Sequence, residues 1–218
     1  MAARQKEADL VATTPGQTAV NGGTKGTHSL ASRVLPPVEL PAGVDELAVE
    51  AAAQLGWDGS VLPMTVLGRR VFVVARLRME AHAERIAMGV EPVTDRATVS
   101  TWTWPELAAT APPAAAETVG VLAVARHWRT GMAATVPFAR YGEAAMVLPS
   151  SAVLTQDYVN NCLPRARTYG MAVVTADEDA VVDLDLSGRT ERLLLDEDAV
   201  SRWVNELVYD QLVVATES

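Results

Sequence analysis

Three short apolar runs between residues 119 and 175 decide the fold: VGVLAVA at 119–125, AAMVL at 144–148 and MAVVT at 171–175. Continuous apolar runs of this length are typical of strands whose two faces are both buried. Residues 128–140 and 156–169, which separate the runs, are expected to form helices. Because strand and helix alternate, the sequence predicts right-handed crossovers and at least three parallel strands.

Prolines and a glycine mark the ends of these elements. Pro149 is expected to stop the second strand, and Gly170 to end the second helix. Pro137 and Pro164 are expected to bend or break the two helices, because proline lacks the N–H that a helix interior needs. Thr155 is the candidate N-cap of the second helix.

Beyond the third run, the chain is predicted to turn back on itself. The acidic triplet 177–179 predicts a turn, and residues 180–186 are expected to return as an antiparallel strand. A last helix is predicted over about residues 197–209, with Asp196 as its cap.

The residues before the first run predict a second group of elements. They are a helix over 44–55 ending at Gly56, a β-hairpin formed by 61–67 and 70–76 with its turn at Gly68, and a helix over 79–88 ending at Gly89. Residues 98–104 alternate strictly and place Trp102 and Trp104 on one face, which predicts a strand with an aromatic face. Residues 105–116 are predicted to form a short turn followed by a flexible loop.

The predicted fold class is therefore α/β, with a mixed sheet that has a parallel β-α-β-α-β core and flanking hairpins. Residues 34–218 are expected to form a single domain of this class. Residues 1–33 are expected to be a disordered N-terminal tail, because they lack periodicity and hold few large apolar side chains.

The composition excludes several classes of protein. Both lysines, Lys6 and Lys25, precede residue 34, so the predicted domain has no lysine for a phosphate-binding P-loop. The single cysteine, Cys162, allows no internal disulfide, and with no apolar leader at the start of the chain this predicts a cytoplasmic location. No stretch approaches 18 uninterrupted apolar residues, so no membrane span is expected.

Negative charge is concentrated near the end of the sequence. The formal charge of the chain is −9, and residues 175–218 contain twelve acidic residues against three arginines. Carboxylates repel phosphate backbones, so specific nucleic-acid binding is not favoured. A solvated surface explains these acids, and an acidic docking surface for a basic partner is the alternative.

Residues 119–186 resemble the second half of the restriction-endonuclease-like, PD-(D/E)XK, fold. The parallel consists of a buried strand, a helix opening at Trp128-Arg129, a strand ending in Leu148-Pro149, a further helix, a strand led by Gly170 and an acidic turn. The resemblance implies a Mg²⁺-binding acid and, two residues later, a lysine on the strand before the first helix, with a second Mg²⁺-binding acid one strand earlier. The corresponding residues are Ala123 and Ala125, so it implies a degenerate site in which Arg126 cannot serve as a general base.

Five residues are candidates for binding. Arg126, His127 and Arg129 follow the first buried strand, at the carboxyl end where ligands usually bind in an α/β sheet. Trp102 and Trp104 offer the large contact area typical of binding surfaces, although core packing is their default role. Arginines in two loose groups, 126–140 and 165–167, could hold phosphate or acidic side chains if they converged.

The sequence thus favours a non-catalytic binding or regulatory protein that acts through contacts with another protein, with no cofactor, no metal and no catalytic residue assigned. One alternative is a metal-dependent nuclease with a migrated active site, in which Asp183 and Asp185 hold the metal from one face of a strand. The other is a small-ligand binder at the strand ends, near Arg126, His127 and Ser150.

Overall fold

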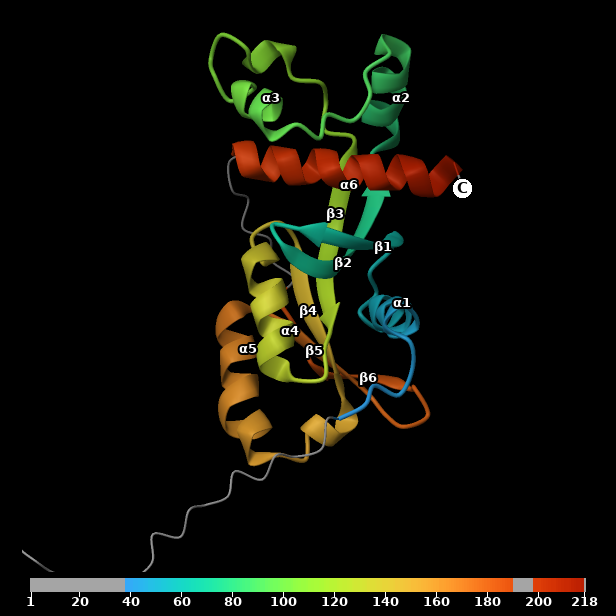
Figure 1. Cartoon of the computed structure of the whole chain (residues 1–218), viewed down its shortest axis with the longest axis vertical. Coiled ribbons are helices and arrows are strands. Elements are labelled where there is room, and N and C mark those ends of the chain that lie inside the picture. The colour runs from blue at the N-terminus through green and yellow to red at the C-terminus, as the bar shows by residue number, and fades with distance from the viewer. Residues whose placement is uncertain (1–37, 190–197, 218) are drawn as a thin grey trace, which may run out of the picture. The chain divides into compact units, whose positions relative to one another are not determined.

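A six-stranded sheet forms the centre of the part of the chain that the computed structural model describes, residues 38–189 and 198–217 (Figure 1). Its strands are β1 (Ser60–Val66), β2 (Arg69–Leu77), β3 (Ala116–Val124), β4 (Glu143–Pro149), β5 (Ala172–Ala176) and β6 (Val182–Leu186). They lie side by side in the order of the sequence. The predicted tail over residues 1–33 lies outside the described residues.

The directions of the strands confirm the α/β class and the mixed sheet. Strands β3, β4 and β5 are parallel, whereas β1, β2 and β3 pair antiparallel, as do β5 and β6. The predicted hairpins therefore flank a parallel core. The first hairpin turns at Leu67 and Gly68, whose φ angles of 50° and 72° are the positive values that a two-residue turn between twisted strands requires.

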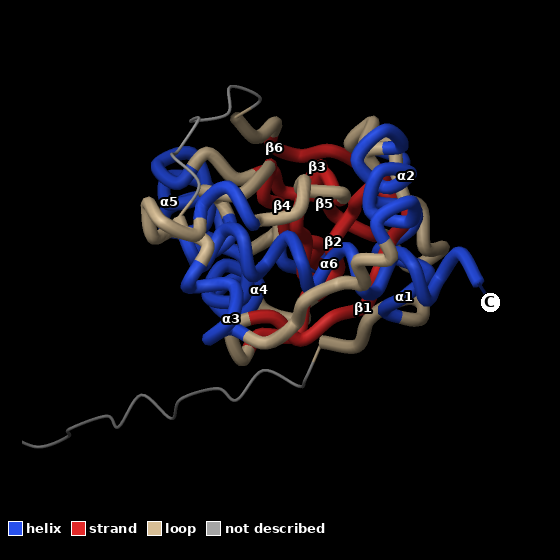
Figure 2. The backbone as a smooth tube through the Cα atoms, turned by 90° about the horizontal axis from the view of Figure 1, so that it is seen from above, coloured by secondary structure: helices blue, strands red, loops and turns tan. Residues whose placement is uncertain are grey.

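Helices cover both faces of the sheet (Figure 2). The six are α1 (Val44–Gln54), α2 (Met79–Met88), α3 (Arg96–Thr101), α4 (Trp128–Thr135), α5 (Leu163–Tyr169) and α6 (Ala199–Glu217). Helix α1 packs on one face, and α4, α5 and α6 pack on the other. None of these helices of the described residues has the length and apolar character that crossing a membrane would need.

The two crossover segments between the parallel strands have the predicted positions and irregularities. Helix α4 ends at Thr135, and a 3₁₀ turn that contains Pro137 follows it. The second crossover begins with a 3₁₀ turn over Ser150–Ala152, and its helix contains a π-helical turn over Tyr158–Cys162 that leads into α5. The Thr155 hydroxyl accepts a hydrogen bond from the N–H of the first residue of this turn at 3.2 Å, which confirms it as a cap.

The central strands are buried on both faces, as their apolar runs predict. Met146 and Val173 point toward α4 and α5, and Val147 and Val174 point toward α1. All four side chains are fully buried. The alternation along each strand therefore assigns neighbouring residues to two separate cores, one on each side of the sheet.

The prediction of a strand over residues 98–104 is wrong, because this segment begins as α3. The Asp95 carboxylate accepts a hydrogen bond from the Thr98 N–H at 2.8 Å and caps the helix. The hydroxyls of Ser100 and Thr101 donate to backbone carbonyls four and three residues earlier, both at 2.7 Å. These local bonds satisfy the polar groups without a neighbouring strand, so alternation of side chains alone was misleading.

The last helix is longer than predicted. Helix α6 runs from Ala199 to Glu217, and the N–H of Ser201 donates to the Asp198 carboxylate at 2.7 Å. The predicted cap, Asp196, lies outside the described residues. Leu212 continues the buried stripe of the helix beyond the predicted end, against the core formed with β1 and β2.

The segment between β2 and β3 packs on helix α6. Its helices α2 and α3 lie on the side of α6 that faces away from α4 and α5 (Figure 1). The fully buried Glu206 carboxylate accepts hydrogen bonds from Nη1 and Nη2 of Arg85, on α2, at 2.8 Å each. It accepts a third from the N–H of Val93, in the connector before α3, at 3.0 Å. One carboxylate thereby joins two parts of this segment to α6.

We expect Glu206→Gln to lower the free energy of unfolding by about 3–5 kcal/mol, because it leaves the buried Arg85 guanidinium without its counter-charge. Urea unfolding followed by circular dichroism measures the loss. The matched control is Asp210→Asn, one turn further along α6, where the carboxylate accepts a hydrogen bond from the exposed Gln211 alone among the described residues, so little change is expected. An unfolding midpoint for Glu206→Gln equal to that of the control would contradict the role given to this pair.

Candidate functional site

The turn from β3 into α4 carries three of the predicted binding residues. His127 caps α4, since its Nδ1 accepts a hydrogen bond from the Arg129 N–H at 3.2 Å. Its ring stacks on the indole of Trp128, with 5.9 Å between ring centroids. Arg126 is exposed and has neither a hydrogen bond nor an ion pair from its side chain among the described residues. The turn thus places an exposed cation, Arg126, at the carboxyl end of β3.

The Trp128 indole is held in place by Asp157. Trp128 is the first residue of α4, is 4% exposed, and donates from Nε1 to Asp157 Oδ2 at 2.8 Å. The same carboxylate accepts from Asn161 at 2.8 Å and from Arg129 at 3.0 Å. The indole bond first, and then the other two, hold the pKa of the Asp157 carboxyl below its usual range. Asp157 therefore stays ionised and joins α4 to the second crossover.

Two guanidinium groups lie over the same indole. Arg129, on α4, places its Cζ 4.3 Å from the centroid of the Trp128 ring, and Arg165, on α5, places its Cζ at 5.6 Å. Both distances fall within the range of cation–π attraction. The ring therefore orients cationic side chains from two helices.

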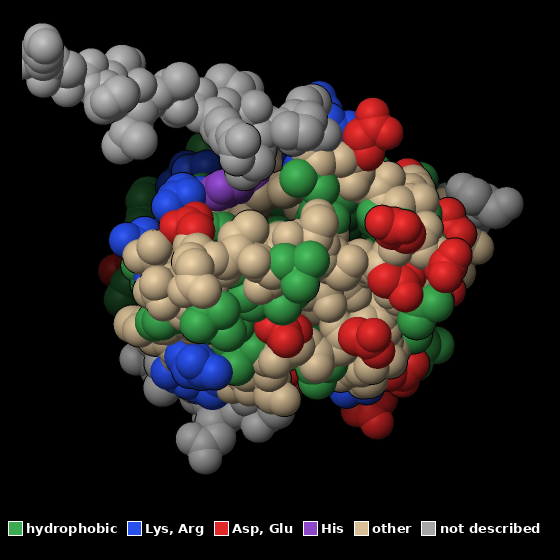
Figure 3. Space-filling model, turned by 90° about the horizontal axis from the view of Figure 1, so that it is seen from below, with side chains coloured by type: hydrophobic (Ala, Val, Ile, Leu, Met, Phe, Trp, Pro, Cys, Tyr) green, Lys and Arg blue, Asp and Glu red, His purple; other side chains and the backbone are tan. Residues whose placement is uncertain are grey.

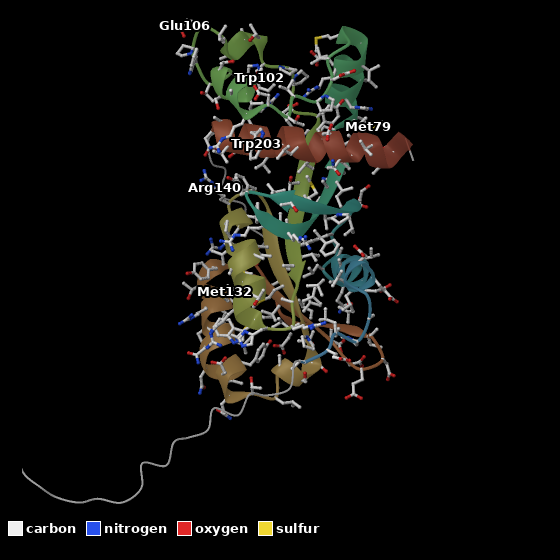
Figure 4. The ribbon with its side chains drawn as sticks, viewed as in Figure 1. Met79, Trp102, Glu106, Met132, Arg140 and Trp203 are labelled. Carbon is white, nitrogen blue, oxygen red and sulfur yellow. The ribbon has the colours of Figure 1, made fainter. Side chains whose placement is uncertain are left out.

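A groove of about 510 Å³ lies where these helices meet the start of β2. Three of its lining residues are arginines, Arg69, Arg129 and Arg165, and its apolar lining includes Trp128, Met132, Val136, Pro137 and the ring of Tyr169. We call it the arginine groove; Met132, labelled in Figure 4, marks its position on α4. Among the described residues, no carboxylate lines it.

The charge of this groove is only partly balanced. Arg129 forms an ion pair with Asp157 at 3.0 Å. Arg69 and Arg165 have no ion-pair partner in the part of the chain that the structure describes. Viewed from below, the molecule shows mainly basic side chains on the side of α4 and α5, and mainly acidic ones on the side of α1 and β6 (Figure 3). The helices α4 and α5, which line the groove, therefore lie on the more basic side of the molecule in this view.

The predicted binding residues fall in two separate places. Arg129 lines the arginine groove, and Arg126 and His127 lie in the turn beside it. Trp102 and Trp104 follow α3 in the sequence, and α3 and the labelled Trp102 lie on the opposite side of α6 from the groove (Figure 4). Trp102 is half-buried with the Arg202 guanidinium 5.4 Å from its ring, and Trp104 is 56% exposed. The tryptophans thus do not form the aromatic strand face that the sequence predicted.

The two arginine groups of the sequence converge in part. Arg129 and Arg165 come together over one indole, as the hypothesis of an anion site requires. Arg140 instead forms an ion pair with Asp198 at the start of α6, at 2.5 Å. The arginines that converge are therefore fewer than the two groups seen in the sequence contain.

The aspartates proposed as an alternative metal site lie on β6. Asp183 and Asp185 are both exposed, and Asp185 accepts a hydrogen bond from the hydroxyl of Tyr158. Burial first, and then this bond, raise the pKa of Tyr158, so the hydroxyl keeps its proton. Among the described residues, no group of three histidine, cysteine or carboxylate side chains is arranged to hold a metal ion.

The positions that correspond to the nuclease-like motif are occupied by small buried side chains. Ala123 is 5% exposed and Ala125 is 7% exposed. A second groove, of about 440 Å³, lies beside Ala123 between β1, β2 and the start of α1. Asp45 is the one carboxylate among its described lining residues, and Arg70 is its one cation. This groove therefore contains a single acid in place of the pair that the resemblance implies.

Two residues of the site were missed by sequence reasoning. Arg69 opens β2, about 60 residues before α4, and reaches the groove because Phe72 pairs with Leu122 near the end of β3. No local pattern carries that pairing. Asp157 follows the recognised cap Thr155 by two residues, so its place near a helix start was readable, although its bond to Trp128 was not.

Known proteins supply no analogy for this site. Neither a family model, nor a curated protein, nor a solved structure matches the chain. The chemistry of the arginine groove must therefore be inferred from its charges, its shape and its contacts.

We expect Asp157→Ala to destabilise the protein most at neutral pH, because the ionised carboxylate accepts three side-chain hydrogen bonds. Its folded-state pKa is lowered, so its contribution is complete above the unfolded pKa and disappears as the pH falls through the folded value. Urea unfolding between pH 7 and pH 3 should show the difference from the parent protein shrinking with acidity. Asp183→Ala, which removes an exposed carboxylate, is the control, and an equal deficit in it would contradict this assignment.

Proposed function

We propose that this protein is a non-catalytic binding protein whose arginine groove takes up an acidic segment of another protein. One observation carries the proposal. Arg69 from β2, Arg129 from α4 and Arg165 from α5 converge on one groove, and two of them lack an ion-pair partner among the described residues. Cationic side chains that come from three elements and share one apolar floor are suited to an anionic partner.

The lining of the groove favours a peptide that combines acidic and apolar side chains. Guanidinium groups bind carboxylates through pairs of charge-assisted hydrogen bonds. Met132, Val136 and Pro137 add apolar surface that an aliphatic side chain of the same segment can cover. Because Arg129 and Arg165 already lie over the Trp128 ring, binding costs them less conformational entropy than it would cost free side chains.

An acidic protein segment fits the charge of the molecule better than a nucleic acid does. The chain has a formal charge of −9, and the acidic side of the face seen in Figure 3 would repel a long phosphate backbone. Nucleic-acid binding depends on many phosphate contacts, whereas the groove offers three cations. A short segment can engage these three without approaching the acidic side.

The chemistry of the groove supports binding without catalysis. Its described lining combines guanidinium groups, which stay protonated, with apolar side chains and the hydroxyls of Thr168 and Tyr169. We further propose that the domain is a degenerate form of the restriction-endonuclease-like fold. The order β3-α4-β4-α5-β5 supports this proposal, as do Ala123 and Ala125 where that family would need an acid and a lysine.

A peptide-binding titration tests the proposed function. The probe is a fluorescein-labelled peptide of glutamate and leucine residues, and its anisotropy is measured against the full chain. We expect the double variant Arg69→Glu/Arg165→Glu to bind the peptide at least about tenfold more weakly than the parent protein. Two cations that donate charge-assisted hydrogen bonds are replaced by anions that repel the peptide. Binding to the parent protein should also weaken as salt is added.

Arg70→Glu is the matched control, because Arg70 neighbours Arg69 on β2 but lines the second groove. We expect it to bind the peptide like the parent protein. The proposal would be overturned if the double variant bound the peptide as tightly as the parent protein does. It would also be overturned if the parent protein bound a single-stranded DNA of the same charge as the peptide more tightly than the peptide. Mg²⁺- or Mn²⁺-dependent cleavage of DNA or RNA that is abolished by Asp183→Ala or Asp185→Ala would instead support the nuclease alternative.

A further inference from the structure

Strand β6 forms one edge of the sheet, and no strand of the described residues pairs with its outer side. The strand at the other edge, β1, contains Pro63, which has no N–H to donate to an added strand. Proline on an edge strand is a common protection against further pairing. Strand β6 has no proline. Of the two edges, β6 is therefore the one whose main chain is better suited to accept another strand.

The register of the β5–β6 hairpin shows which main-chain groups of β6 point outward. The N–H of Asp177 donates to the carbonyl of Val181 at 3.0 Å, so these residues form a hydrogen-bonded pair at the turn. In an antiparallel ladder, such pairs alternate with pairs that do not bond to each other. Counted along the register from the turn, Val182 and Leu184 fall in the second kind of pair. Their N–H and C=O groups therefore point away from β5, toward the open edge.

The side chains of β6 give this edge two different faces. Val182 packs against the core on the α1 side of the sheet, and Leu184 faces the same side and is 39% exposed. Asp183 and Asp185 face the other side, where Asp185 accepts a hydrogen bond from the hydroxyl of Tyr158. Both aspartates are exposed. An added strand would therefore meet apolar side chains on one face and carboxylates on the other.

The charges of the hairpin favour a basic partner strand. The turn residues 177–179 are all acidic and add to Asp183 and Asp185, whereas the next cation along the chain, Arg189, lies beyond the end of β6. A second copy of this chain that paired edge to edge would bring these acids together, and like charges on neighbouring strands are destabilising. Lysine or arginine side chains beside the two aspartates would instead form cross-strand pairs of opposite charge.

We infer that the outer edge of β6 binds an extended segment of another protein in which basic and apolar residues alternate. The segment adds a strand to the sheet, and its main chain pairs with the outward groups of Val182 and Leu184. Its basic side chains lie beside Asp183 and Asp185, and its apolar side chains cover Leu184. This site is separate from the arginine groove, because β6 contributes no residue to the lining of that groove.

A titration of the full chain with the acetylated and amidated peptide Lys-Val-Lys-Val-Lys-Val-Lys tests this inference, with amide hydrogen exchange measured by NMR. We expect exchange at the N–H groups of Val182 and Leu184 to slow at least about tenfold at saturation, because both become hydrogen-bonded. A peptide with the same residues in one lysine block and one valine block should bind at least about tenfold more weakly, since it cannot present the two kinds of side chain on opposite faces.

Three outcomes of this titration would overturn the inference. The first is unchanged exchange at the two amides when the alternating peptide is bound. The second is equal binding of the block peptide. The third is slow exchange at the same amides that grows with protein concentration in the absence of peptide, which would identify a second copy of the chain as the occupant.

A matched pair of charge reversals gives the second readout. Asp183→Lys places a cation at the edge and should weaken binding of the alternating peptide at least about tenfold, because repulsion replaces attraction. Glu106→Lys makes the same change in net charge at an exposed residue on the other side of α6 from β6 (Figure 4). We expect it to bind the peptide like the parent protein. Equal affinities of the two variants would show that net charge alone attracts the peptide, against the inference.

Discussion

Burial of the central parallel strands on both faces is the constraint on which the rest of the structure depends. Every residue of β4 from Ala144 to Pro149 is buried, so apolar helices must cover each side of the sheet. Parallel neighbours also need crossovers, and α4 and α5 supply both the crossover and the cover. Because α4 starts immediately beyond the end of β3, its first residue, Trp128, becomes a fixed floor at the carboxyl end of the sheet. The arginine groove is thus a consequence of how the core closes, since the residues that cover the sheet also place its cations.

The long segment between β2 and β3 has a different basis of stability. It adds no strand to the sheet, and its helices α2 and α3 gain their position from α6. Glu206 is central to this attachment, because its carboxylate is bonded to Arg85 and to the Val93 N–H.

Local patterns predicted the elements whose stability is local, and failed where distant residues decide. The buried runs predicted β3, β4 and β5, and Gly68 predicted the hairpin, because strand burial and turn geometry are written in neighbouring residues. The 98–104 segment was misread, although Asp95 three residues before Thr98 was an available cap signal. The sequence suggested an anion site only if the arginines converged. Whether Arg129 and Arg165 converge depends on how α4 packs on α5, which the sequence does not give. The position of Arg69 at the groove and the ion pair between Glu206 and Arg85 could not be predicted. Contacts between residues so far apart in the sequence leave no local pattern.

The acids near the end of the sequence do not form one docking surface, because several of them have structural partners. Glu206 is buried against Arg85, Asp198 is paired with Arg140, and Asp185 accepts the Tyr158 hydroxyl, so part of this charge has a structural role. The exposed acids of this region that the structure describes do not line the arginine groove, and acidic side chains gather on the α1 and β6 side of the face in Figure 3. For the acidic segment that we propose as the partner, this distribution of charge favours an approach from the side of α4 and α5. The net charge of −9 is therefore compatible with the proposed acidic segment, because salt screens distant charges and the nearby arginines govern the last few ångströms of binding.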